Sequence, residues 1–342
     1  MLHINLNSCK HFYGRNTETK RAKSLLRKGQ SISIIGPTGI GKTIFICNLV
    51  NLLKQIPQYK VVCFDGAAMT SRDEGEIYYL LAKSIQETWK NKISNPKDRS
   101  TAYKDLEKTV CKSIDQGFRL VICLDNIDRL VASNDLGREF FSGLRALVTQ
   151  FGVTFATTSR KSLSKMADQI DCLPFLSLFL PLRLNLLNEM ESRGILEEII
   201  KQARFDLLPE ATNAIIYFAG GHPSLLHQLA RSIIQGHLSQ NVFLPESQET
   251  AILQSILPHM QKQLQRLWHD LDQEQRCALA YLPYLSNDKR CQITLDQLQS
   301  LSLLIKHKQS YTYFSPLLKE FASQQSISPA CARYFPSVSR AA

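Results

Sequence analysis

Short apolar runs alternate with segments of helical periodicity over the first half of the chain. The runs are continuous, which is typical of parallel strands buried on both faces, and they cover residues 30–35, 59–64, 119–125 and 153–158. A fifth strand is expected at 175–180. Between the runs, apolar residues recur at intervals of three and four, which predicts helices over 44–53, 74–89, 103–115 and 139–150. The sequence therefore predicts an α/β fold, a parallel sheet covered by helices that binds its ligand at the carboxyl ends of the strands.

The pattern changes beyond Pro181. Residues 184–236 contain only helical runs, interrupted at 219–223, and a polar segment at 239–250 leads to a further unit. In that unit helical runs precede a hairpin-like stretch at 305–314 and a helix that begins at Pro316. Helices followed by a wing predict a winged-helix domain. The tail from Ser326, rich in Ser, Pro and Ala, is expected to be disordered.

A glycine-rich motif joins the first predicted strand to the helix after it. It fits the Walker A pattern G-x-x-x-x-G-K-[ST] at every fixed position. The glycines let successive backbone N–H groups point at phosphate oxygens, and the helix adds its positive N-terminal end. Lys42 would reach the β- and γ-phosphates of ATP, and the Thr43 hydroxyl would ligate Mg²⁺. The alternative, a flexible glycine-rich turn, does not explain the strand before and the helix after. The nucleotide-binding residues predicted here are Gly36, Pro37, Thr38, Gly39, Ile40, Gly41, Lys42, Thr43 and Ile44.

Asp125 ends the third apolar run and is the natural Walker B partner of Thr43. A lone acid at the end of a strand beside a phosphate loop can hold Mg²⁺ through its waters. The alternative role for Asp125 is a cap of the next helix. Motif and acid together predict a P-loop NTPase sheet with an additional strand between its two motifs, the ASCE type.

The position after Asp125 bears on turnover. ATPases of this type usually carry a carboxylate there, which acts as base toward the attacking water, whereas this chain has Asn126. An amide orients water but accepts no proton, and a positioned base contributes about 10²–10⁴ in rate. We therefore expect slow hydrolysis unless Asp128 or another carboxylate substitutes, although Asp128 is expected to cap a helix or to pair with Arg129. Arg160, after the fourth strand, would detect the terminal phosphate, or is simply a surface residue. The catalytic candidates are Lys42, Asp125, Asn126 and Arg160.

The ordered motifs resemble a known family. FYGRNTE, GPTGIGKT, LVICLDNIDRL, FFSGLRAL, VTFATTSR, FAGGHPSLL and YTYFSPLLKEF, from about His11 to Phe321, are similar to the STAND ATPases, signal-transduction ATPases with numerous domains. The likeness is strongest to their bacterial AAA-like branch, near the archaeal ATPase and origin-recognition groups. It implies that Gly14 and Arg15 contact the adenine and the nucleotide, and that Gly221 and Pro223 belong to a helical lid. Related members carry a His-Asp pair that detects ADP where this chain has Ser315-Pro316.

The resemblance and the hydrophobic pattern together predict five segments. They are an adenine-contacting segment and helix at 1–29, a nucleotide-binding domain at 30–183, a helical lid at 184–250, a winged helix at 251–324 and a disordered tail at 325–342.

Composition excludes several classes of protein. The 342 residues are 44% hydrophobic, and no apolar run approaches the roughly 20 residues that cross a bilayer. We expect a soluble cytoplasmic protein without a membrane partner. The nine cysteines are dispersed, which predicts reduced thiols and no metal cluster built from side chains alone.

The formal charge of +11 is concentrated near the N-terminus, where seven basic residues lie between Lys10 and Lys28 against Glu18 alone. This segment is a surface for nucleic acid or an acidic partner, or a solvated helix face. The expected recognition helix at 294–303 has no Lys or Arg, which favours a packing module over a DNA contact.

Two functions follow. The favoured one is a Mg²⁺-dependent ATP/ADP switch with slow hydrolysis that controls conformation and either self-association or binding of an unknown protein partner. The alternative is a DNA-associated ATPase, similar to a replication initiator or transposition regulator, that uses the basic N-terminal helix and the wing. A metabolic kinase is a weaker third, because no acceptor pocket is evident.

Overall fold

The computed structural model describes residues 13–69, 73–86, 98–132, 136–161, 163, 173–244, 247–285, 291–308, 310–325 and 331–335. The chain forms two compact units. The first contains residues 1–35 and 42–184, and the second contains residues 36–41 and 185–342.

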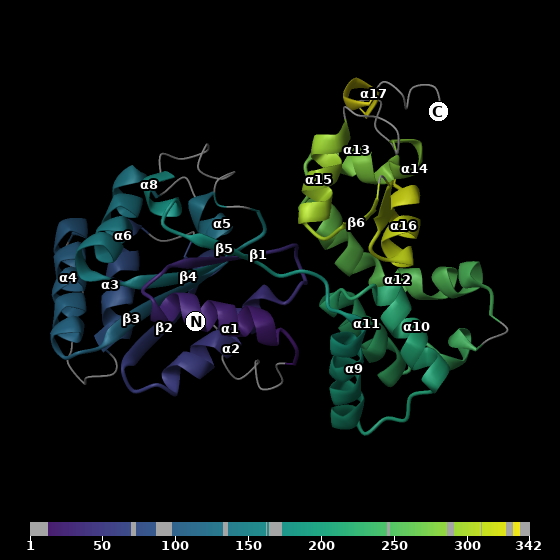
Figure 1. Ribbon diagram of the computed structural model, residues 1–342, viewed down its shortest axis with the longest axis horizontal. Coiled ribbons are helices and arrows are strands. Elements are labelled where there is room, and N and C mark those ends of the chain that lie inside the picture. Colours follow the sequence, from purple (N-terminus) through teal and green to yellow (C-terminus); the bar gives the residue numbers. More distant parts are fainter. Residues whose placement is uncertain are drawn as a thin grey trace. The chain divides into compact units, whose positions relative to one another are not determined.

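A five-stranded parallel sheet forms the centre of the first unit (Figure 1). Its order is β2-β3-β4-β1-β5. The strands are β1 (Ile32–Ile35), β2 (Tyr59–Asp65), β3 (Arg119–Asp125), β4 (Thr154–Ser159) and β5 (Leu180–Arg183). The predicted α/β fold with a parallel sheet is therefore confirmed.

Helices cover both faces of this sheet. On one face lie α1 (Asn16–Arg27) and α2 (Lys42–Lys54). The other face packs in one apolar cluster with α3 (Glu74–Gln86), α4 (Arg99–Asp115) and α6 (Arg138–Phe151). Side chains alternate accordingly, because Phe64, Ile122 and Leu124 enter that cluster. The short elements are η2 (Gly66–Ala68), α5 (Ile127–Val131) and α8 (Leu173–Leu176).

The prediction for the fifth strand was wrong. Residues 173–176 form α8, and the strand begins at Leu180. The aromatic rings of Phe175 and Phe179 pack in T-shaped contact with Phe155, which removes them from the sheet. Pro181 has no N–H to donate and is tolerated because β5 is an edge strand.

The helix predicted at 103–115 begins earlier, at Arg99. The Asp98 side chain accepts the backbone N–H of Thr101 at 2.9 Å and caps this helix, so that Arg99 and Ser100 are helical rather than part of a loop. The polar residues 91–100 predict a surface loop before this helix, and residues 91–97 of it lie outside the described residues.

Helices dominate the second unit. They are α9 (Glu189–Ala203), α10 (Pro209–Ala219), α11 (Pro223–Ile234), η4 (Gln240–Phe243), α12 (Glu249–His269), α13 (Gln273–Ala280), α14 (Leu282–Leu285), α15 (Gln292–Ser300), α16 (Pro316–Ser323) and α17 (Cys331–Tyr334). The hairpin expected at 305–314 is present as the antiparallel strands β6 (Leu304–His307) and β7 (Ser310–Tyr313). One apolar cluster runs from Leu196 to Phe335, so the segments predicted as lid and winged helix share a core.

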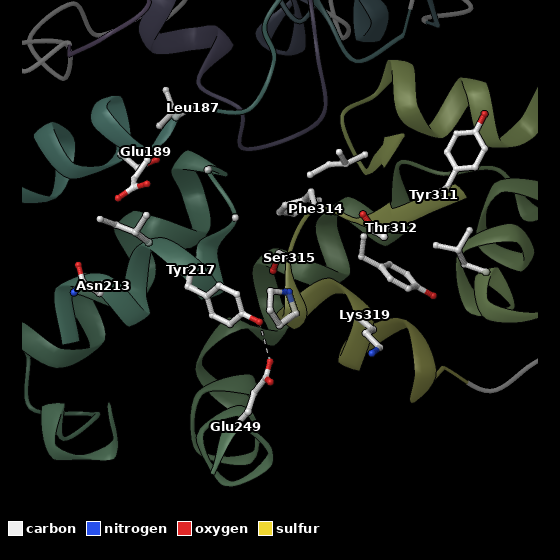
Figure 2. A pocket seen from close by; sticks show the side chains of 18 of the residues that line it. Leu187, Glu189, Asn213, Tyr217, Glu249, Tyr311, Thr312, Phe314, Ser315 and Lys319 are labelled. Atoms are coloured by element: carbon white, nitrogen blue, oxygen red, sulfur yellow. Dashed lines mark hydrogen bonds between the residues drawn. The ribbon is translucent and has the colours of Figure 1, made fainter. Parts of the chain in front are cut away.

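A cavity of about 1130 Å³ opens within this unit, and Figure 2 shows side chains from α10, β7 and α16 around it. At its rim Gly220 ends α10 in the left-handed region, with φ of 56°. A Cβ there would overlap the carbonyl oxygen of Phe314, so the close approach of the two segments requires glycine.

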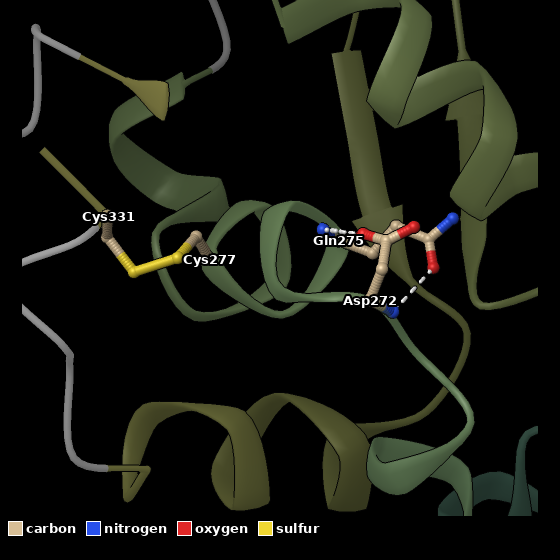
Figure 3. Close-up of a disulfide and its surroundings, with 4 residues drawn as sticks. All are labelled: Asp272, Gln275, Cys277 and Cys331. Atoms are coloured by element: carbon tan, nitrogen blue, oxygen red, sulfur yellow. Dashed lines mark hydrogen bonds between the residues drawn. A yellow bond between two sulfur atoms is a disulfide. The ribbon is translucent and has the colours of Figure 1, made fainter. Parts of the chain in front are cut away.

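A disulfide joins Cys277 in α13 to Cys331 in α17 (Figure 3). Beside it Phe335 is 2% exposed and belongs to the core. The expectation of reduced thiols was wrong for this pair. Within the tail expected to be disordered, residues 331–334 form α17, and Cys331 and Phe335 join the core. The described cysteines Cys47, Cys63, Cys111, Cys123 and Cys291 are free.

The sequence also predicts that the chain has neither a metal cluster built from side chains nor a membrane-spanning helix. The described residues contain no group of His, Cys, Asp and Glu arranged to hold a metal ion. Within the same residues, every helix is too short or too polar to span a membrane.

Candidate nucleotide site at the strand ends

The structure brings the two predicted magnesium ligands together. The hydroxyl of Thr43, in the first turn of α2, donates a hydrogen bond to Asp125 Oδ2 at the end of β3, over 2.7 Å. Lys42 precedes Thr43 and is 8% exposed, and Asp125 is 2% exposed. A hydroxyl and a carboxylate oxygen at this separation are the hard oxygen donors that Mg²⁺ prefers, so the residues fit the ion.

Asp125 accepts hydrogen bonds from three side chains. Thr158 Oγ1, at the end of β4, donates to Oδ1, while Thr43 Oγ1 and Asn126 Nδ2 donate to Oδ2. Burial nevertheless raises the pKa of Asp125 above its ordinary value, and the carboxylate of Asp65 adds to that rise. A cation bound beside this carboxylate would offset the cost of burying its charge.

Asn126 adopts a left-handed backbone conformation, with φ of 54° and ψ of 44°. Asparagine tolerates this region better than most residues. The turn directs its backbone N–H to Thr158 Oγ1 at 2.8 Å and its side-chain Nδ2 to Asp65 Oδ1 at 3.0 Å. Asn126 follows β3, so its backbone and side-chain N–H groups together connect the ends of β2, β3 and β4.

Sequence analysis missed Asp65 and Thr158. Asp65 is the last residue of β2 and the register partner of Asp125. The available signal was that two apolar runs, 59–64 and 119–124, each end in an aspartate. Thr158 gave no signal, because a buried threonine is ordinary in a strand.

Arg160 pairs with Asp128, and the distance from Nε to Oδ2 is 2.5 Å. Asp128 was expected to cap a helix or to pair with Arg129, but the N-cap of α5 is Asn126 and the partner of Asp128 is Arg160. Asp128 lies in the first turn of α5, is buried and faces the end of β4, whereas Arg129 is exposed. The Arg160 side chain is 36% exposed to solvent. Its contact with the terminal phosphate of ATP remains a prediction.

Gly14 and Arg15 both have positive φ, 75° and 58°, immediately before α1. Arg15 is buried and forms an ion pair with Glu18 at 3.3 Å, which fixes its guanidinium at the start of the helix. Their predicted contact with adenine is not tested by this arrangement.

Residues 36–41 of the phosphate loop pack with the second unit. The backbone N–H of Ser224 donates to the Gly39 carbonyl oxygen at 3.2 Å, and His222 Nε2 donates to the Thr38 carbonyl oxygen at 3.1 Å. The Thr38 hydroxyl also donates to the carboxylate of Asp270. The loop is therefore held by α11, the helix that begins at Pro223.

The other two lid predictions lie next to His222. Gly221 has φ of 76°, and its carbonyl oxygen accepts the Leu187 N–H at 2.8 Å. Pro223 occupies the first helical position of α11, where a missing N–H costs nothing.

Ser315 occupies the position at which the resemblance to the STAND ATPases implies an ADP-detecting pair. Its hydroxyl accepts the backbone N–H groups of Leu317 and Leu318 and donates to the Phe218 carbonyl oxygen at 2.7 Å. The side chain is buried and serves as the N-cap of α16. In Figure 2 it lies at the cavity of the second unit, near Tyr217, which donates to Glu249 at 3.2 Å. No sequence pattern indicates this cavity.

Comparison with known proteins supports the class of this site. Residues 26–166 match the family described as AAA domain. No curated protein matches the chain. Together with the phosphate loop and the sheet, the match defines this part of the chain as a P-loop ATPase domain of the AAA-like class.

Solved structures share the fold over nearly the whole chain. A Walker-type ATPase of Pyrococcus abyssi is 12% identical with a TM-score of 0.63, covering 91% of this chain and 96% of its own. The ORC2 protein of Aeropyrum pernix, in ADPNP–ADP complexes, is 15% identical with a TM-score of 0.56, covering 94% and 93%. The ORC1 protein of Aeropyrum pernix, in complex with DNA, is 14% identical with a TM-score of 0.52, covering 97% and 95%. At these identities the likeness establishes the fold alone.

Proposed function

We propose that the protein is an ATP-dependent molecular switch of the STAND type, in which nucleotide state controls conformation and either self-association or the binding of a protein partner. The observation that carries the proposal is the hydrogen bond between Thr43 Oγ1 and Asp125 Oδ2, with Lys42 buried beside it. Thr43 and, through water, Asp125 would hold Mg²⁺, which when bound neutralises charge on the β- and γ-phosphate oxygens. Lys42 would bind the same phosphates.

The second unit is the proposed responding element. We interpret α13, α15 and the β6–β7 hairpin as a winged helix, and α9 to α11 as the lid. Their shared core supports movement as one body, because separating them would expose the apolar cluster from Leu196 to Phe335. A ligand shifts such an equilibrium only by binding one conformation more tightly than the other.

Binding of ATP in the presence of Mg²⁺, measured by titration calorimetry, tests the site. Lys42→Ala should weaken binding at least about tenfold, since it removes a charge-assisted contact to phosphate. Lys54→Ala, at the exposed C-terminal end of the same helix, is the control and should bind like wild type. Absence of binding by the wild type, or equal affinity of Lys42→Ala and wild type, refutes the site.

The switch is tested separately, by solution mass and amide hydrogen exchange with ADP, ATP and a non-hydrolysable analogue. ATP should change the mass, or the exchange of residues 185–325, even where turnover is negligible. Identical mass and exchange in all three states would leave a nucleotide-binding protein that is not a switch.

DNA association is the second candidate, because Lys20, Arg21 and Arg27 are exposed on α1. The wing argues against it. Lys306 Nζ is paired with Asp296 of α15 at 3.2 Å, and α15 contains no Lys or Arg. A mobility-shift series at two salt concentrations decides, since a phosphate contact weakens steeply with salt and no shift at low salt eliminates this candidate.

A further inference from the structure

We propose that Asp65 is the general base for ATP hydrolysis and that Asn126 positions it. The inference rests on the proposed nucleotide site and deepens it. It concerns the proton acceptor that the position after Asp125 lacks.

The described carboxylates at this edge of the sheet have different surroundings. Asp125 faces Thr43 and is assigned to the metal. Asp128 is buried in its ion pair with Arg160. Asp65 is half-buried at the end of the neighbouring strand, in register with Asp125. Asp65 is therefore the carboxylate that can meet a water molecule beside the metal-holding oxygen atoms.

Asn126 links this carboxylate to the metal site. Its Nδ2 donates to Asp65 Oδ1 at 3.0 Å and to Asp125 Oδ2 at 3.3 Å. Asp65 Oδ1 also accepts the Ala67 N–H at 3.0 Å. Both hydrogen bonds use Oδ1, so they hold the side chain in place without occupying Oδ2. Asn126 thus acts through Asp65 as a positioning residue.

The backbone is shaped for this approach. Gly66 follows Asp65, and a Cβ on Gly66 would lie 2.8 Å from the Asn126 carbonyl oxygen and 2.9 Å from that of Asp125. Any larger residue would therefore separate the end of β2 from the end of β3.

The chemical step balances with ATP and water. The water oxygen bonds to the γ-phosphorus, and the bond from that phosphorus to the β–γ bridging oxygen breaks, with its electron pair leaving on ADP. The water proton moves to Asp65 Oδ2 and passes to solvent when phosphate leaves.

Asp65→Asn is a sharp test. Asparagine retains the Oδ1 that accepts from Ala67 and Asn126, and it caps η2 as well as aspartate does, so only the basic oxygen is lost. Single-turnover hydrolysis should fall by about 10²–10⁴. Affinity for ATP and for ADPNP should stay within about twofold, while affinity for ADP with tetrafluoroaluminate, which mimics the transition state, should fall at least about tenfold. Asp98→Asn, at the cap of α4, is the matched control and should behave like wild type in all three measurements.

A double variant separates catalysis from structure. Asp65→Asn with Asn126→Asp reverses the amide–carboxylate pair and keeps one hydrogen bond between the same positions. It should recover at least about tenfold of the lost single-turnover rate, because the carboxylate returns to the same water. Asn126→Asp alone is the control, because a carboxylate at position 126 is the usual base of such ATPases. It should not raise the single-turnover rate above wild type, since its charge would oppose that of Asp65, and a rate increase as large as the recovery in the double variant would contradict Asp65 as base.

The outcomes are distinguishable from those of the nucleotide site. Loss of ATP binding by wild type refutes the site itself. If ATP binds normally but Asp65→Asn hydrolyses it at the wild-type rate, Asp65 is refuted as the base and the nucleotide site stands. The same conclusion follows if the wild type binds ATP and does not hydrolyse it. Failure of the double variant to exceed Asp65→Asn also contradicts the proposal.

Discussion

Two adjacent threonines in β4 provide a matched test of the hydrogen bonds around Asp125. Thr157 and Thr158 are both fully buried. The Thr158 hydroxyl donates to Asp125 Oδ1 and accepts the backbone N–H of Asn126 at 2.8 Å. The Thr157 hydroxyl is buried without a hydrogen-bond partner among the described residues. Valine has the same shape and the same β-branching as threonine, so strand propensity cancels between the two variants.

The two substitutions should have different effects on the free energy of unfolding. Thr158→Val removes a hydrogen bond to a carboxylate and deprives the N–H of Asn126 of its acceptor, which together should destabilise by about 2–4 kcal/mol. Thr157→Val replaces a buried hydroxyl without a partner by a methyl group. It should be neutral or stabilise by up to about 1–2 kcal/mol.

Scanning calorimetry of the full chain measures the difference. The two variants should therefore differ by about 2–6 kcal/mol. At about 2–4 °C per kcal/mol for a unit of this size, their melting temperatures should differ by roughly 4–24 °C. Thr158→Val should also weaken binding of Mg²⁺–ATP, since Asp125 loses a hydrogen bond that orients it, while Thr157→Val should bind normally. Equal melting temperatures, or a lower one for Thr157→Val, would refute the described hydrogen bonding.

Three further predictions follow from the described contacts. Burial raises the pKa of Asp125, so the folded state holds the carboxyl proton more tightly than the unfolded state does. The nucleotide-free protein should therefore lose stability as the pH rises from about 3.9, the ordinary pKa of aspartate, through the higher pKa of Asp125 in the folded state. Asp125→Asn should therefore raise the melting temperature at pH ~7 yet abolish Mg²⁺-dependent nucleotide binding, and its gain should disappear in melts below about pH 3.9. Gly220→Ala should lower the free energy of unfolding by more than about 3 kcal/mol in calorimetry, because its Cβ would overlap the Phe314 carbonyl oxygen. Gly236→Ala, also at positive φ but with open space around it, is the control and should cost only about 1–2 kcal/mol. Equal costs would exclude the overlap with Phe314 as the cause. Reduction of Cys277–Cys331, which closes a loop of 54 residues, should destabilise the second unit by about 2–4 kcal/mol, with Cys331→Ser insensitive to reductant as the control.

Sequence periodicity predicted the sheet because buried parallel strands are continuous apolar runs. Four strands began and ended within about two residues of their expected positions. The fifth failed because Phe175 and Phe179 are as apolar as strand residues but pack as aromatic rings against Phe155. Periodicity cannot distinguish these alternatives in a short run.

The contacts missed by sequence analysis depend on strand order and on long-range pairing. Arg160 directly follows β4, and Asp128 lies in α5, which follows β3. Their ion pair forms because β3 and β4 are neighbours in the order β2-β3-β4-β1-β5. The same holds for the disulfide, whose cysteines are 54 residues apart and meet only because Phe335 joins the core. Neither strand order nor such a closure is encoded in any local pattern.

The expectation of slow hydrolysis illustrates the same limit. It placed the usual base directly after Asp125, where this chain has an amide, and left open that Asp128 or another carboxylate substitutes. Under the proposal above, Asp65 is that carboxylate, because β2 and β3 end in register and Asn126 Nδ2 donates to Asp65 Oδ1 at 3.0 Å. An amide is also the better occupant of position 126 beside Asp65, since a second carboxylate 3.0 Å from Asp65 Oδ1 would oppose its charge, whereas Nδ2 donates a hydrogen bond to it. Asn126 is therefore explained as a partner of Asp65 and does not by itself imply a defective ATPase.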